Sequence, residues 1–172
     1  MNKPKLTEAE ARAMIAGYNI TDKVCLLGIR GYYKNTMGKP GVNDRGIYDD
    51  AVFIISPDKF ISFNYNTDPS NYKDGIAVLK TGVWRYRPGK HKINSPHGYP
   101  AFVQAGPVTV IRDKKGPDTG WFGINIHRGG IGTGSLGCQT LPIDQWDEFR
   151  STLMKQLEAY KQKDFPYILI EQ

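Results

Sequence analysis

Short stretches of β-branched and aromatic residues recur along the chain, bounded by Gly, Pro, Asn and Asp. Such stretches are typical of strands. They predict strands at residues 24–29, 51–55, 60–64, 76–79, 83–86, 101–104, 108–111, 121–127 and 167–170. The connections at residues 30–50 and 88–100 are longer than packing requires, and ordered loops of that length are often functional.

Two segments carry helix signals. Thr7 and Glu10 have the spacing of a capping box, which predicts a helix that continues towards Gly17. Pro142 suits a helical first turn, and beyond it apolar residues recur at spacings of three and four: Ile143, Trp146, Phe149, Leu153, Leu157 and Tyr160. The elements predict one domain over residues 1–172 that is mainly β, a β-rich α+β fold with an N-terminal and a C-terminal helix.

Composition narrows the class of protein. The chain has 172 residues, of which 40% are hydrophobic and 23% charged, which is too apolar for a disordered protein. Two cysteines do not make a disulfide framework, and no apolar run has the roughly 20 residues of a membrane span. The polar start argues against a signal peptide.

The net charge of +6 permits an anionic partner without selecting one. The densest basic stretch, residues 84–92, mixes cations with aromatic residues, as nucleic-acid surfaces do. No groove-reading motif accompanies it, so we interpret it as a solvated strand end and expect no nucleic-acid partner.

Residues 126–140 carry the clearest chemistry. A predicted strand ends in His127, a glycine-rich loop follows, and Cys138 comes shortly before the second helix. A cysteine becomes a nucleophile when a nearby base favours its thiolate, and histidine is suited to accept that proton near neutrality. The separation of 11 residues allows the loop to double back. The backbone N–H groups of Gly137 and Cys138 are candidates for an oxyanion hole.

Other interpretations use the same loop. Residues 132–137 match G-x-G-x-x-G, but a dinucleotide site needs the helix to open at the glycines. Ser135 as the nucleophile of a hydrolase elbow would need glycine where Thr133 stands.

Three further interpretations involve residues outside that loop. A zinc site would draw on candidates that lack the tight spacing of common zinc motifs, namely His91, His97, His127 and Cys138. A Cys25–Cys138 disulfide would silence the thiol. Three acidic residues of the first long loop are candidates for a cation or substrate site: Asp44, Asp49 and Asp50. We expect neither a resident metal nor a cofactor.

The segment resembles the active-site motif of the L,D-transpeptidase (YkuD-like) catalytic domain. That family has a strand-borne His, a loop, then Ser/Thr-His-Gly-Cys followed shortly by Arg or Asn. By position, His127 matches the general base and Cys138 the nucleophile, while Ser135 and Gly137 match the Ser/Thr and Gly. The resemblance is tight over residues 124–140.

The chain departs from the family pattern at two positions. Leu136 replaces the second His, Thr140 replaces the Arg or Asn, and the His–Cys loop is shorter than usual. This marks a divergent relative. We take Arg128 and His97 as candidates to supply the missing polar groups and, with Tyr99, to bind substrate.

The resemblance implies a β-sandwich and a cysteine acyl-transfer enzyme that acts on peptidoglycan stem peptides. Without an export signal, the protein is expected to be made in the cytoplasm and to act on the wall when released or processed. It would then be a phage lysis enzyme or a recycling carboxypeptidase. That favours water over an amine as acceptor. The alternative is a non-catalytic wall-polymer-binding module on the same fold.

Overall fold

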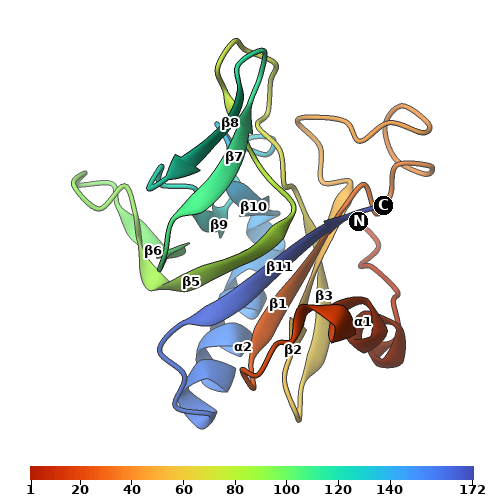
Figure 1. Ribbon diagram of the computed structural model, residues 1–172, viewed down its shortest axis with the longest axis vertical. Helices are drawn as coiled ribbons and strands as arrows, with labels where there is room; N and C mark the ends of the chain where they lie inside the picture. The colour runs from red at the N-terminus through yellow and green to blue at the C-terminus, as the bar shows by residue number, and fades with distance from the viewer.

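The computed structural model describes residues 1–172 and is mainly β (Figure 1). Its helices are α1 (Glu8–Ile15), a 3₁₀ turn at Ala16–Tyr18, and α2 (Ile143–Ala159). The strands are β1 (Cys25–Arg30), β2 (Asp50–Ile55), β3 (Phe60–Tyr65), β4 (Ala77–Leu79), β5 (Gly82–His91), β6 (Tyr99–Gln104), β7 (Val108–Arg112), β8 (Gly116–Gly120), β9 (Ile126–Arg128), β10 (Gln139–Leu141) and β11 (Phe165–Glu171). The predicted β-rich α+β class, with a helix near each end, is confirmed.

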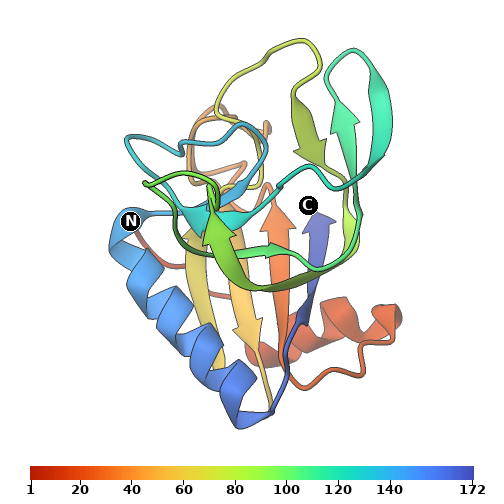
Figure 2. The same cartoon turned by 90° about the vertical axis from the view of Figure 1, so that its left-hand side faces the viewer.

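Eight strands form one sheet in the order β10-β9-β6-β5-β11-β1-β2-β3, and β4-β7-β8 form a smaller sheet. The pairs β1–β11 and β9–β10 are parallel, and the other pairs are antiparallel. Figure 2 shows that the large sheet is strongly curved, with β5 running across the direction of β1, β2 and β3. Both sheets contribute to one core. The expected β-sandwich is therefore built from a strongly curved eight-stranded sheet and a smaller three-stranded sheet, which share one core.

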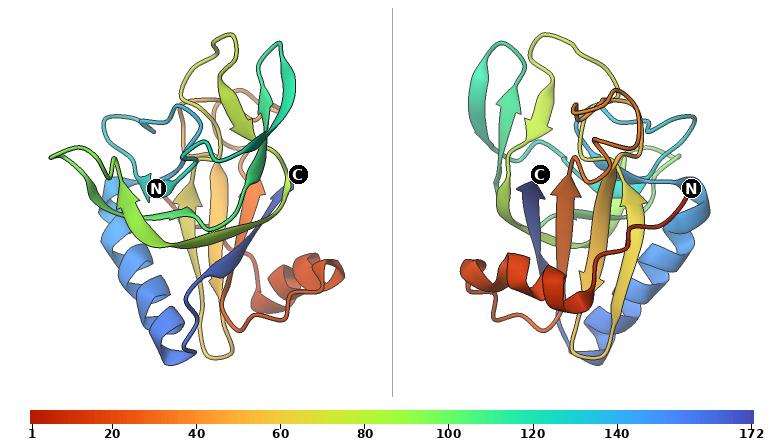
Figure 3. Two further views of the ribbon diagram at one scale, coloured as in Figure 1. Left: turned by 60° about the vertical axis from the view of Figure 1, so that its left-hand side comes forward. Right: turned by 90° about the vertical axis from the view of Figure 1, so that its right-hand side faces the viewer.

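The alternation of side chains along β1 and β2 explains why the two helices lie on opposite faces (Figure 3). Leu26 and Ile54 belong to the larger core, together with Phe149 of α2. Leu27 belongs to the smaller core beneath α1, with Ala11. Both faces of these central strands are therefore buried.

The predicted capping box is present. The Thr7 hydroxyl accepts from the Glu10 backbone N–H, and the Glu10 carboxylate accepts from the Thr7 N–H. Pro142, predicted within the first turn of α2, is its N-cap residue. None of the helices combines the length and apolar composition needed to cross a membrane.

Several strand boundaries differ from the predictions. Strand β5 continues to His91, so the predicted loop at 88–100 shrinks to a turn between β5 and β6. Of the predicted strand 121–127, only the end is paired, in β9. Strand β8 was missed because its sequence, Gly-Pro-Asp-Thr-Gly, is typical of a turn; it pairs only with β7, and an edge strand tolerates proline. The three-residue strand β10 was also missed.

Candidate active site

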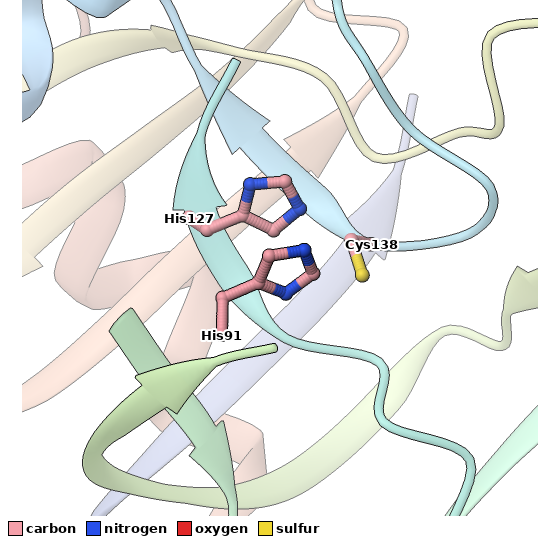
Figure 4. A group of neighbouring side chains, drawn as sticks. All are labelled: His91, His127 and Cys138. Carbon is pink, nitrogen blue, oxygen red and sulfur yellow. The ribbon is translucent and has the colours of Figure 1, made fainter. Parts of the chain in front are cut away.

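Parallel pairing of β9 with β10 brings the predicted His–Cys pair together. Gln139 lies opposite Ile126, so Cys138, just before β10, lies beside the start of β9. There its Sγ accepts the Asn125 backbone N–H at 3.4 Å. A ring nitrogen of His127 lies within 4.8 Å of that sulfur (Figure 4). The loop therefore doubles back, as its length allowed.

Ser135 holds the turn that carries the cysteine. Its hydroxyl donates to the Cys138 carbonyl at 2.6 Å and accepts the Gly137 N–H at 3.0 Å. The Ser135 N–H donates to the Ser70 hydroxyl at 2.9 Å. Because Ser135 is only 2% exposed and fully engaged, it is a structural residue, and the interpretation as a serine nucleophile is wrong.

The expected oxyanion hole loses one of its two donors. The Gly137 N–H is committed to Ser135, whereas the Cys138 N–H makes no hydrogen bond within the protein. A tetrahedral intermediate at Cys138 would therefore find one loop N–H available rather than two.

Backbone geometry accounts for glycines of the loop. Gly137 has φ +132°, and a Cβ there would lie 2.7 Å from the Ala77 carbonyl oxygen. A Cβ on Gly129 would collide with the Tyr48 hydroxyl, which donates to the Gly132 carbonyl at 3.0 Å. Since α2 begins only at Ile143, the glycines do not open a helix, which removes the basis for a dinucleotide site.

The hydrogen bonds of His127 determine its tautomer. Its Nδ1 lies 2.6 Å from the Arg128 carbonyl oxygen, so Nδ1 carries the proton and donates it there. The Tyr99 hydroxyl lies 2.9 Å from the same nitrogen. Nε2 is left with a free lone pair and faces Cys138 in Figure 4. Burial, and then the neighbouring His91, lower the pKa of His127 to about 4, so the ring is neutral and able to accept a proton at neutral pH.

The sulfur is a neutral thiol in this arrangement. Burial raises the pKa of Cys138 to about 11, and its S–H donates to the Gly123 carbonyl at 3.4 Å. The predicted motif implied a thiolate favoured by its neighbours. No charged neighbour offsets the effect of burial at this half-buried sulfur, so the structure gives no support for a thiolate in the resting site.

His91 also lies at the site, although the sequence suggested it only as a candidate zinc ligand and not as a neighbour of the His–Cys pair. Its ring stacks on His127 with centroids 3.9 Å apart and planes 20° apart, and its Nδ1 lies 3.1 Å from the Asn125 side-chain nitrogen. Sequence reasoning placed it in a loop, whereas it ends β5. His91 thus supplies a second imidazole beside the thiol. It comes from β5, whereas the family pattern places its second histidine at the position of Leu136, in the loop before β10.

Of the three residues predicted to bind substrate, Tyr99 and Arg128 lie at the site and His97 does not. Tyr99 lies at the site, and the Arg128 guanidinium lies 4.7 Å from the centre of its ring. His97 is exposed in the β5–β6 turn, where its backbone N–H donates to Ser95. It lines neither of the two cavities at the site, so the expectation for His97 is wrong.

Two cavities meet at His91. One, of about 460 Å³, is lined by Cys138, His127, Tyr99, Arg128 and Leu136, among others. The second, of about 750 Å³, includes the cationic residues Arg87 and Lys90 and the exposed Trp121. Both also include Lys92. The thiol lines the smaller cavity, and the larger one, with its cationic residues, begins beyond His91 and Lys92.

The remaining sequence alternatives are resolved by distance and bonding. Cys25 is buried beneath α1, and both cysteines are free, so no disulfide silences the thiol. The acidic loop residues accept backbone N–H groups instead of converging on an ion: Asp44 from Lys39, Asp49 from Asp44, and Asp50 from Gly31 and Thr67.

No family model, curated protein or solved structure matches this chain. The parts of the site are a thiol, an imidazole with a free lone pair, a free backbone N–H and two open cavities. These are the functional groups that nucleophilic acyl transfer requires.

Proposed function

We propose that the protein is a cysteine acyl-transfer enzyme of the L,D-transpeptidase type that acts on peptidoglycan stem peptides, with water favoured as the acceptor. One observation carries the proposal. A ring nitrogen of His127 lies within 4.8 Å of the Cys138 sulfur, the unprotonated Nε2 faces that sulfur (Figure 4), and both residues line the 460 Å³ cavity. The motif supplies the substrate class, and the geometry supports the chemistry.

In the proposed reaction, the Cys138 sulfur attacks the carbonyl carbon of a stem-peptide bond. His127 Nε2 takes the thiol proton as the C–S bond forms, because the resting pair is neutral and a preformed thiolate is disfavoured. The oxyanion is stabilised by the Cys138 N–H. The imidazolium then protonates the leaving amine, which leaves a thioester on Cys138.

Water or an amine resolves the thioester, with His127 again accepting the proton of the attacking group. The Arg128 carbonyl and the Tyr99 hydroxyl at Nδ1 keep the ring oriented through both steps. The cationic residues of the cavities suit the carboxylates of a stem peptide, since Arg forms directed bonds to carboxylate and Lys a point-charge contact.

The test is turnover of purified muropeptides, with products identified by mass. We expect Cys138→Ala to lower turnover by about 10³-fold or more, because a covalent nucleophile has no substitute. Cys25→Ala is the matched control, since that thiol is buried elsewhere. The wild type, but not Cys138→Ala, should carry an acyl adduct in intact-mass spectra. Equal turnover by wild type and Cys138→Ala would remove Cys138 from the mechanism.

The departures from the family pattern at Leu136 and Thr140 favour a second candidate, a wall-polymer-binding module without activity. Leu136 is 81% exposed at the cavity where the resembled family has a histidine. For such a module, wild type and Cys138→Ala would sediment equally with purified sacculi, and neither would release a product.

A further inference from the structure

We propose that His91, His127 and Cys138 form a binding site for one zinc-class divalent cation, and that the bound cation withdraws the nucleophile from acyl transfer. Their ligand atoms all lie within 4.8 Å of one another. Two imidazole nitrogens and one thiolate sulfur are a donor set that zinc and its softer neighbours prefer. The inhibitory half rests on the proposed function; the binding half does not.

The three residues come from separate elements that the fold brings together. His91 ends β5, His127 lies in β9, and Cys138 precedes β10. In Figure 4 the two rings lie side by side and both face the sulfur. The cluster is therefore a product of tertiary structure, which is why sequence spacing gave no metal motif.

The ligand atoms of the three side chains need to move only a short distance to bind one ion. A tetrahedral zinc ion with Zn–N near 2.0 Å and Zn–S near 2.3 Å holds its ligand atoms roughly 3.3–3.6 Å apart. The present separations reach at most 4.8 Å, so side-chain movements of about 1 Å complete the site. The 460 Å³ cavity borders all three residues and leaves room for a water as fourth ligand.

The outer hydrogen bond of His127 already suits metal ligation, and that of His91 does so once the Asn125 amide is turned. Metal-bound histidines donate their second ring N–H to a carbonyl, carboxylate or water. His127 does this, because its Nδ1–H donates to the Arg128 carbonyl at 2.6 Å. His91 Nδ1 faces the side-chain amide of Asn125 at 3.1 Å, and Asn125 is 8% exposed. With that amide turned by 180°, its oxygen accepts the Nδ1–H and His91 Nε2 is free to bind.

Charge and proton number both balance when the cation binds. The cation brings two positive charges, Cys138 releases its thiol proton to solvent, and the thiolate sulfur bonds to the metal. Each neutral imidazole donates one lone pair and stays neutral. The sulfur lone pair that would attack a carbonyl is then held by the metal, and the His127 lone pair that would take the proton is held with it.

The experiment titrates the full chain, freed of metal with chelator, with Co²⁺. We expect one equivalent to bind and to produce a thiolate-to-cobalt charge-transfer band, which one equivalent of Zn²⁺ removes. Cys138→Ser should lose the band, His91→Ala should weaken binding by tenfold or more, and Cys25→Ser should match wild type. A band that survives Cys138→Ser, or no binding at micromolar Co²⁺, would overturn the site.

Turnover then tests inhibition. One equivalent of Zn²⁺ should abolish muropeptide turnover in the wild type, chelator should restore it, and the fraction lost should be smaller in His91→Ala. Unchanged or increased turnover with Zn²⁺ bound would overturn the inhibition. If no form turns over muropeptides, the proposed function fails, and the cobalt band still decides the metal site.

Discussion

Asp49 is a buried carboxylate whose removal should stabilise the protein. It is 0% exposed, one oxygen accepts the Asp44 N–H at 2.9 Å, and no protein group donates to the other. Burial raises its pKa from an ordinary 3.8 to about 6. Asp49→Asn keeps the size and the acceptor oxygen, and it removes a charge that is poorly compensated at neutral pH.

The sign of the pH dependence follows from linkage. A folded pKa above the unfolded one means that the stabilising contribution is complete below about pH 4 and is lost as pH rises through about 6. The full rise in pKa corresponds to about 3 kcal/mol. Solvent close to this surface loop screens part of that cost, so we expect about 1–2 kcal/mol. Asp49→Asn should match wild type at pH 4 and exceed it by that amount at pH 7.5.

Urea unfolding at the two pH values measures the difference. With a slope near 2 kcal/mol per molar, the midpoint of Asp49→Asn should lie roughly 0.5–1 M higher at pH 7.5. Asp147→Asn makes the same change of charge on the exposed face of α2 and should stay within about 0.5 kcal/mol of wild type. If Asp49→Asn is less stable than wild type at pH 7.5, the carboxylate is held ionised by its surroundings and the reasoning fails.

Three further substitutions test the support of the site. Tyr99→Phe removes the hydroxyl 2.9 Å from His127 Nδ1 and should lower kcat/KM about 3–10-fold in the muropeptide assay, with Tm unchanged. Gly137→Ala forces a side chain against a backbone carbonyl at φ +132°; turnover should fall at least about tenfold and stability by about 1–3 kcal/mol, and unaltered turnover would contradict this. Tyr167→Phe leaves the buried Gln139 oxygen without its donor, and calorimetry should show a Tm lower by roughly 2–10 °C.

Local signals were sufficient for most of the architecture. The capping box at Thr7 and the apolar periodicity of α2 are short-range patterns, and both helices formed where those patterns lie. Strands β8 and β10 escaped because their existence depends on partners. The turn-like residues 116–120 extend only beside β7, and β10 is three residues held against β9.

The sequence was sufficient to predict two residues of the candidate site, but it did not predict the third residue or the pKa of the thiol. His127 and Cys138 could be paired from the loop between them. His91 could not, because it is 36 residues from His127 along the chain, and its place was fixed only when β5 extended past the expected turn. The raised pKa of Cys138 was equally hidden, since it depends on how closely the strands enclose the sulfur.

The position of Cys138 depends on packing at the centre of the large sheet. Gly28 in β1 has no side chain, and a Cβ there would lie 2.6 Å from the Tyr167 hydroxyl. That space lets Tyr167 donate to the Gln139 side-chain oxygen at 2.9 Å, while the Gln139 amide donates to the Gly137 carbonyl at 3.2 Å. All of these groups are buried, where a hydrogen-bond donor or acceptor is costly to leave unpaired. The residue before Cys138 is therefore tied to the core by a chain of contacts, and the alignment of the sulfur with the two imidazoles depends on the packing of β1 against β11.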